Sequence, residues 1–103
     1  MTKELYDDCY VDTEGNVATI GFNDDEKSLK TVQNIIFFEY NIGVGDKIKK
    51  GDKLLSVEAM KGTLELKSRV AGQVIELNGD VEEEPDLLKE NPTQWLVKMK
   101  LER

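Results

Sequence analysis

A lysine at the point where two strands should reverse is the first candidate for chemistry in this chain. Lys61 lies within SVEAMKGTLEL, residues 56–66, where apolar and polar residues roughly alternate on both sides of Met60-Lys61-Gly62. Gly62 can adopt the positive φ that a tight hairpin turn needs, so the lysine should point away from the sheet. Its amine is a nucleophile once deprotonated, and mobile cofactors that carry groups between enzymes are attached through such amines. On these residues alone, an ordinary solvated turn lysine is the alternative.

The residue types that the sequence lacks exclude several enzyme chemistries. There is no histidine, and Cys9 is the one cysteine, which rules out Ser-His-Asp and Cys-His systems, ordinary zinc sites and an internal disulfide. The usual phosphate-binding glycine loops are absent, and no pair of acidic residues stands out for acid–base catalysis. Carboxylate catalysis stays open in principle, and Cys9 is interpreted as a small hydrophobe.

Length and charge limit the class of protein. The chain has 103 residues, and we expect residues 1–103 to form a single domain without a linker. It carries 21 acidic and 14 basic side chains, and its formal net charge of -7 opposes binding to nucleic acid or an anionic membrane. The longest bulky apolar run, residues 35–38, is too short to span a bilayer, and the N-terminus resembles no signal or transit peptide. We therefore expect a cytoplasmic protein.

The elements that should position Lys61 are mostly short strands. Strands are predicted within residues 15–22, 34–40, 44–59, 68–77 and 94–101, and the partner strand after Lys61 carries Leu64 and Leu66. Short helices are predicted over 23–32, with Asn23 and Asp24 as caps, and over 80–92 near Pro85. Many short strands with glycine turns predict an all-β fold, a small flattened barrel or sandwich of two antiparallel sheets with one or two short helices.

The surroundings of Lys61 resemble the biotinyl/lipoyl attachment domains. That family has two glycine turns, a glutamate three residues before the modified lysine, and a later turn of small residues. Here these features are Gly45-Asp46, Gly51-Asp52, Glu58, Lys61 and Ala71-Gly72. The resemblance implies a lipoyl-domain-like fold with Lys61 as the attachment lysine. It also implies that Glu58, Met60 and Gly62 are recognised by the attaching enzyme.

Nearly the whole chain, about residues 15 to 100, resembles the glycine cleavage system H protein family. VATIGF and IIFFEYNIGVGD are similar to that family's strand before its helix and its strand before the first Gly-Asp turn. In LNGDVEEEPDLLKENPTQWLVKMK, the characteristic positions are Asn78, Val81, Pro85, Leu87, Pro92 and Trp95. The resemblance therefore identifies the chain as a member of this family in a short H-like form.

Several residues depart from the H-protein pattern. Typical H proteins have Val before and Ala after the lysine, whereas this chain has Met60 and Gly62. Because EAMK matches the biotin-carrier pattern as far as the lysine, a biotin carrier remains an alternative. Thr93 and Lys89 replace residues that are usual in the family, and the sequence stops at Arg103 without the family's C-terminal helix. We expect these differences to affect docking to glycine decarboxylase partners more than lipoylation.

The function that the resemblance implies is that of a non-catalytic carrier with lipoate bound covalently to Lys61. Implied partners are a lipoate–protein ligase or lipoyltransferase, and glycine decarboxylase, an aminomethyltransferase and dihydrolipoyl dehydrogenase. For a short H-like protein the alternative is a redox or stress role, regulated by a sirtuin-type ADP-ribosyltransferase and a macrodomain protein, with acceptors such as Asp24, Asp25 or Glu26. An interaction domain with an unmodified lysine is a third possibility.

Three further interpretations concern packing. Trp95 is interpreted as a core anchor. Phe37 and Phe38 should point to opposite faces of their strand, one into the core and the other under the helix or near the hairpin turn. The acidic run Glu82–Glu84 is interpreted as a solvated helix start, where carboxylates favour the helix dipole.

Overall fold

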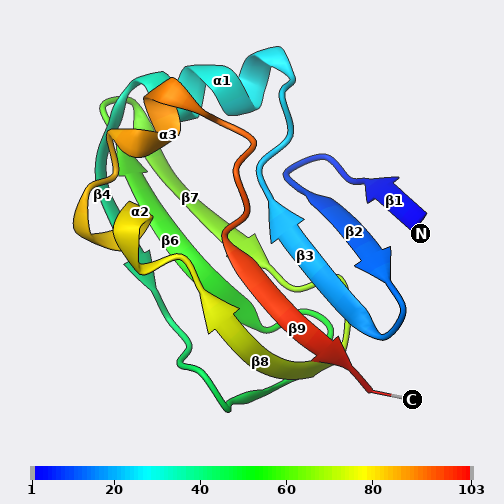
Figure 1. Ribbon diagram of the computed structural model, residues 1–103. Coiled ribbons are helices and arrows are strands. Elements are labelled where there is room, and N and C mark those ends of the chain that lie inside the picture. Colours follow the sequence, from blue (N-terminus) through cyan, green and yellow to red (C-terminus); the bar gives the residue numbers. More distant parts are fainter. Residues whose placement is uncertain (1, 103) are drawn as a thin grey trace.

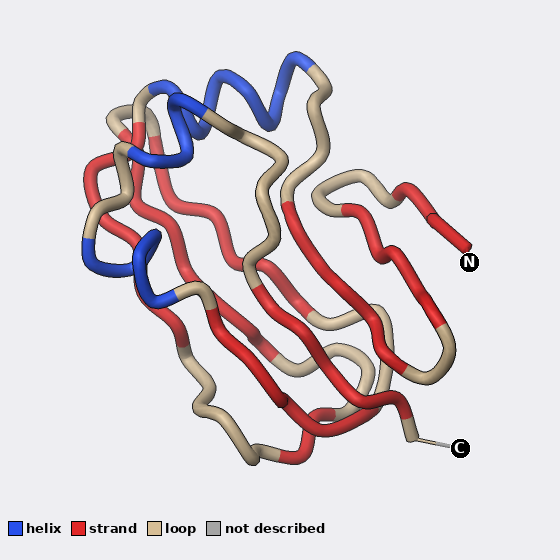
Figure 2. The backbone as a smooth tube through the Cα atoms, in the orientation of Figure 1, coloured by secondary structure: helices blue, strands red, loops and turns tan. Residues whose placement is uncertain are grey.

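Two antiparallel sheets pack against each other in the computed structural model, which describes residues 2–102 (Figure 1). The larger sheet has the strand order β1-β2-β3-β9-β8-β5, and the smaller has the order β4-β6-β7. Figure 2 shows α1 and α3 gathered at the end of the sandwich where β6 turns into β7. The prediction of an all-β sandwich of two antiparallel sheets is confirmed, with three short helices where one or two were predicted.

The strands are short and are joined mainly by tight turns. Those of the larger sheet are β1 (Thr2–Leu5), β2 (Tyr10–Glu14), β3 (Val17–Gly21), β5 (Lys47–Ile48), β8 (Gly72–Leu77) and β9 (Val97–Leu101). Those of the smaller sheet are β4 (Ile35–Tyr40), β6 (Lys53–Ala59) and β7 (Gly62–Lys67). The helices are α1 (Glu26–Gln33), α2 (Gly79–Glu83) and α3 (Leu87–Glu90).

The core lies between the sheets and follows the period of two that strands impose on their side chains. Most outward-facing residues of the same strands are polar, so burial fixes the register of each strand. The large apolar strand residues that are exposed instead are Leu5, Ile36, Phe37 and Ile75. Each helix adds one fully buried apolar residue to the core. The apolar side chains that are at most 2% exposed are Cys9, Val11, Ala18, Ile20, Phe22, Val32, Phe38, Leu54, Leu55, Val57, Leu66, Val74, Val81, Leu88, Leu96, Val97 and Met99.

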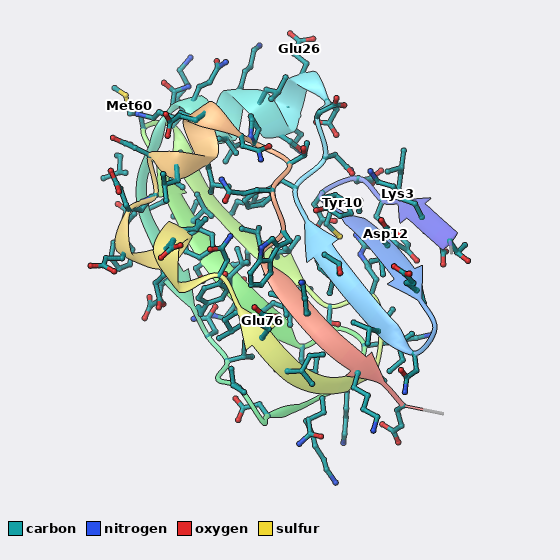
Figure 3. The ribbon with its side chains drawn as sticks, in the orientation of Figure 1. Lys3, Tyr10, Asp12, Glu26, Met60 and Glu76 are labelled. Carbon is teal, nitrogen blue, oxygen red and sulfur yellow. The ribbon has the colours of Figure 1, made fainter. Side chains whose placement is uncertain are left out.

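An N-terminal hairpin, formed by β1 and β2, has no counterpart among the predicted elements. It adds two strands to the edge of the larger sheet, with Tyr10 opposite Gly21 of β3. The Tyr10 hydroxyl donates a hydrogen bond to the carbonyl of Thr93 at 2.8 Å, and the Lys3 ammonium lies 4.7 Å from the Tyr10 ring centroid (Figure 3). Acidic residues interrupt the apolar alternation of this segment, which hides its strand pattern.

The predicted helix over residues 80–92 is two separate helices, α2 and α3. Pro85 lies between them and cannot donate the backbone hydrogen bond that a continuous helix would need. Glu83 and Glu84 therefore lie at the end of α2 and not at a helix start, so the helix-dipole interpretation is wrong for them. The Glu82 carboxylate is also not simply solvated, because it accepts a hydrogen bond from the backbone N–H of Tyr40 at 3.1 Å.

Trp95 packs differently from its prediction, whereas Phe37 and Phe38 agree with theirs. Trp95 is only partly buried and has the Lys98 ammonium 4.8 Å from its ring centroid, so the core anchor at this position is the neighbouring Leu96. In β4, Phe38 lies in the core while Phe37 is 51% exposed. The two rings therefore point to opposite faces of a half-buried strand, and Phe37 lies opposite Glu58 near the hairpin turn.

The buried thiol of Cys9 should be inert in the folded protein. Burial, and secondarily the Asp8 carboxylate, raise the pKa of this thiol to about 12. We therefore expect native protein at pH 8 to react with an aromatic disulfide reagent roughly a thousandfold more slowly than protein in urea, because the thiolate is the reactive form. Since the folded-state pKa is raised, the associated stability is fully present below the unfolded-state pKa and is lost as pH rises towards 12. Rapid labelling without denaturant would contradict this burial.

Candidate functional site

Lys61 occupies a two-residue turn between β6 and β7. Ala59 and Gly62 are the last paired residues of the two strands, which leaves Met60 and Lys61 as the turn. Gly62 has φ +148°, a conformation that other residues rarely adopt, and open space surrounds its missing Cβ. The prediction that this glycine serves the turn is confirmed, because its backbone conformation and not local crowding requires it.

The side chains of the turn are presented to solvent. Met60 is 75% exposed and projects from the end of the molecule in Figure 3. Lys61 is exposed, and its ammonium makes no hydrogen bond or ion pair with any residue in the described range 2–102. An amine in this position can be reached by another protein without rearrangement of the chain.

Helix α1 supports the turn from one side. Its N-cap is Asp25, whose carboxylate accepts a hydrogen bond from the Ser28 N–H at 2.7 Å and consequently has a lowered pKa. Asn23 and Asp24, the predicted caps, are not the residues that cap it. At the other end, the Asn34 side chain donates to the carbonyl of Lys30 at 2.8 Å. The Asn34 carbonyl accepts a hydrogen bond from the Met60 N–H at 3.1 Å, which fixes the turn to the end of α1.

A groove of about 460 Å³ lies between α1 and the turn, and Lys61 is part of its wall. Lys27 and Lys30 line it from α1, while Thr63 and Leu64 line it from β7. None of the described residues that line it is acidic. Lys30 also forms a solvent-exposed ion pair with Glu26 at 3.4 Å, which contributes little to stability. The groove is therefore a locally cationic surface on a chain with a net negative charge.

Glu58 is not among the residues that line the groove and lies on the outer face of the smaller sheet. It is exposed and stands opposite Thr63 of β7 on one side and Phe37 of β4 on the other. The structure thus brings Met60, Lys61 and Gly62 together at the turn and places Glu58 beside them on the adjoining face.

Sequence analysis missed the residues that α1 contributes. Lys27, Lys30, Thr31 and Asn34 follow the three- and four-residue spacing that places side chains on one face of a helix. That stripe was a detectable signal of a polar helix face. Its position beside Lys61 depends on tertiary packing across about thirty residues of sequence, which periodicity does not specify.

Two other kinds of site have no support in residues 2–102. This range contains no group of three or more Cys, Asp or Glu side chains arranged to hold a metal ion. No helix within it is long and apolar enough to cross a membrane.

Comparisons with known proteins give one consistent family. Residues 2–103 match the family described as Glycine cleavage H-protein. A glycine cleavage system H protein from Carboxydothermus hydrogenoformans is 35% identical over 94 residues, which cover 89% of this chain and 70% of that protein. One from Staphylococcus haemolyticus is 37% identical over 94 residues, covering 89% of this chain and 72% of that protein.

A solved structure gives the same result for the fold. The crystal structure of a glycine cleavage system H protein from Mycobacterium marinum superposes with a TM-score of 0.78 at 18% sequence identity. The match covers 96% of this chain and 82% of that chain. At this identity the likeness bears on the fold alone.

Proposed function

The chain belongs to the glycine cleavage H-protein family, and on this premise we propose that it is a non-catalytic lipoyl carrier with lipoate bound to Lys61. The observation that carries the proposal is the turn itself. It presents an exposed amine, free of hydrogen bonds and ion pairs within residues 2–102, at the end of a rigid hairpin. The Met60–Asn34 hydrogen bond fixes this turn to the end of α1.

Attachment requires one acyl transfer to the lysine. The deprotonated Lys61 Nζ attacks the carbonyl carbon of a lipoate that the attaching enzyme has activated as a mixed anhydride with phosphate. The N–C amide bond forms, the C–O bond to the phosphate breaks, and the amine proton is released. Glu58, Met60 and Gly62 are the residues beside Lys61 that the attaching ligase or lipoyltransferase would contact.

The protein's own contribution after attachment is position. When bound, the dithiolane supplies disulfide exchange and carries the transferred group. The hairpin holds Lys61, to which the lipoyl group is attached, at a fixed point, and α1 supports the turn. Because the turn is exposed, the lipoyl group is accessible to partner enzymes. In the glycine cleavage role, these partners would be the decarboxylase, the aminomethyltransferase and the dihydrolipoyl dehydrogenase of that system.

Intact mass tests the proposal directly. The protein is co-expressed with a lipoate–protein ligase and supplied with lipoate, and in parallel with a biotin ligase and biotin. We expect the mass of one lipoyl group, located by peptide mapping at Lys61, and no retention on streptavidin. Retention on streptavidin would instead support a biotin carrier, and an unmodified chain in both cultures would support an interaction domain.

The charge of the groove favours a second candidate function, in which the lipoyl group on Lys61 takes part in redox chemistry. A transferred aminomethyl group is positively charged, and Lys27 and Lys30 would repel it while attracting a thiolate or another anion. In this role, modification of exposed acids such as Asp24 or Glu26 by ADP-ribose would regulate the carrier. Asp25 is a poorer acceptor, since its carboxylate already caps α1.

Small disulfides distinguish the two functions. The reduced lipoylated protein is mixed with an anionic or a cationic disulfide at low ionic strength, and the two exchange rates are compared. If the lysines attract anions, the anionic reagent should react about two- to fivefold faster than the cationic one. Lys27→Gln/Lys30→Gln should remove the difference, whereas the control Lys49→Gln/Lys50→Gln, in the turn after β5, should keep it. A preference that survives in the first variant would count against this role of the groove.

A further inference from the structure

The outer face of the smaller sheet is exposed to solvent. Cross-strand pairs place Phe37, Glu58 and Thr63 in one row, and Glu39, Ser56 and Glu65 in the next. All of these except the half-buried Ser56 are exposed, so no other described element covers this face. The row of Phe37 and Glu58 is the one closer to the turn that holds Lys61.

One corner of this face exposes large apolar side chains. A register shift between Ile35 and Phe37 leaves two consecutive residues exposed, Ile36 at 60% and Phe37 at 51%. Met60, at 75%, follows Ala59, which pairs with Ile35. We call Ile36, Phe37 and Met60 the apolar corner. Such a cluster is typical of a surface that a partner covers, and aromatic residues are frequent anchors of interfaces.

The part of the face near the apolar corner carries acidic residues, whereas Lys53 and Lys67 lie at the far end of β6 and β7. Glu65 forms an ion pair with Lys53 at 3.0 Å, but Glu39 and Glu58 have no ion-pair partner within the described part of the chain. The unpaired charges on this part of the face are therefore negative, and they lie next to the ammonium of Lys61 in the turn. A partner that binds there should present basic side chains around an apolar depression.

We propose that Ile36, Phe37 and Glu39 extend the contact surface of the enzyme that acylates Lys61 beyond Glu58 and Met60. The apolar corner and the two glutamates then form one docking surface for this enzyme. This inference rests on the proposed function. The acylating enzyme must bring an acyl carbon within bonding distance of the Lys61 amine, so it necessarily contacts the surface next to the turn. An enzyme that reacts with the attached lipoyl group can contact it at the dithiolane, away from the surface next to the turn. The acylating enzyme also holds a carboxylate and phosphate groups, for which its active site must be basic, and this complements the acidic face.

The test is the rate at which a purified lipoate–protein ligase, supplied with lipoate and ATP, modifies the unlipoylated protein. Ile36→Ser/Phe37→Ser removes two anchors, and Leu5→Ser/Ile75→Ser removes two exposed apolar residues from strands of the other sheet. We expect the first variant to raise KM for the carrier about tenfold with little change in kcat, and the second to change KM less than twofold. Thermal melting of each variant confirms that it is folded.

Reversing the charge of Glu39 gives a second, independent version of this test. Glu39→Lys should raise KM several-fold, while Glu14→Lys, an equal charge change in the hairpin between β2 and β3, should not. Equal KM values for the test and control variants, or a loss confined to kcat, would overturn the docking surface while lipoylation of the wild type upheld the carrier function. A wild type that accepts no lipoyl group would overturn both.

Discussion

Lys61→Arg should accept no lipoyl group while unfolding at the same temperature as the wild type. Arginine keeps the positive charge and the length of the side chain, but its guanidinium stays protonated and is not an acyl acceptor. Because Lys61 is exposed and has no partner within residues 2–102, its replacement should change the free energy of unfolding by less than about 0.5 kcal/mol. Intact mass after co-expression with a ligase, together with a thermal melt, measures both effects.

The matched control for this variant is Lys67→Arg. Lys67 is also exposed and lies at the other end of β7, so the same chemical change is made away from the turn. This control should be lipoylated like the wild type. If Lys61→Arg still gained the mass of a lipoyl group, the attachment would be at another lysine, and the proposal would lose its basis. Unfolding of Lys61→Arg would instead make the lysine structural.

Gly72→Ala should destabilise the protein by about 3 kcal/mol, near the upper end of the usual cost of overpacking. A Cβ at this position would lie 2.3 Å from the carbonyl oxygen of Lys100 and 3.1 Å from the Cα of Leu101. These are backbone atoms of β9, and Gly72 is paired with Ile48 of β5 on its other side, so neither neighbour can move freely. For a chain of this size, the loss corresponds to a fall in melting temperature of roughly 15 °C.

Gly79→Ala is the comparison that isolates this crowding. Gly79 begins α2, has no atom within 4 Å of its missing Cβ, and does not have a positive φ. Alanine there should leave stability unchanged or raise it by up to about 1 kcal/mol. Urea unfolding of both variants measures the difference, and a Gly72→Ala protein as stable as Gly79→Ala would show that β8 and β9 can separate without cost.

The structural role of Gly72 could not be predicted from the sequence alone. The pair Ala71-Gly72 was predicted as a turn, yet Gly72 is the first residue of β8, and the close approach of β9 requires it. Glycine signals both a turn and a close backbone contact, and only the position of the neighbouring strand separates the two. That neighbour, β9, is more than twenty residues away in sequence.

The fold class was predictable because alternation of apolar residues is a local property. The strands of Leu55 and Val57, of Leu64 and Leu66, and of Val97 and Met99 all follow it. Sheet order was not predictable, since β3 pairs with β9 across about eighty residues, Val17 opposite Lys100. Periodicity states which face of a strand is buried but not which strand lies beside it.

In the candidate site, too, some residues could be predicted from the sequence and others could not. Met60, Lys61 and Gly62 are consecutive, so their spacing alone predicts a turn that presents an amine. Lys27, Lys30 and Asn34 reach the same place only because α1 packs beside the hairpin. The apolar corner was equally hidden, since the sequence gives no sign of the register shift that exposes Ile36 together with Phe37.

The hydrogen bond between Glu82 and Tyr40 has a consequence for self-association. Strand β4 is an edge of the smaller sheet, and such an edge can recruit a strand from another molecule and begin aggregation. The Glu82 carboxylate occupies the Tyr40 N–H, and the register shift near Ile36 breaks the regular spacing of the remaining donors and acceptors. Both features make β4, which exposes Ile36 and Phe37, a poorer template for pairing with another copy of the chain.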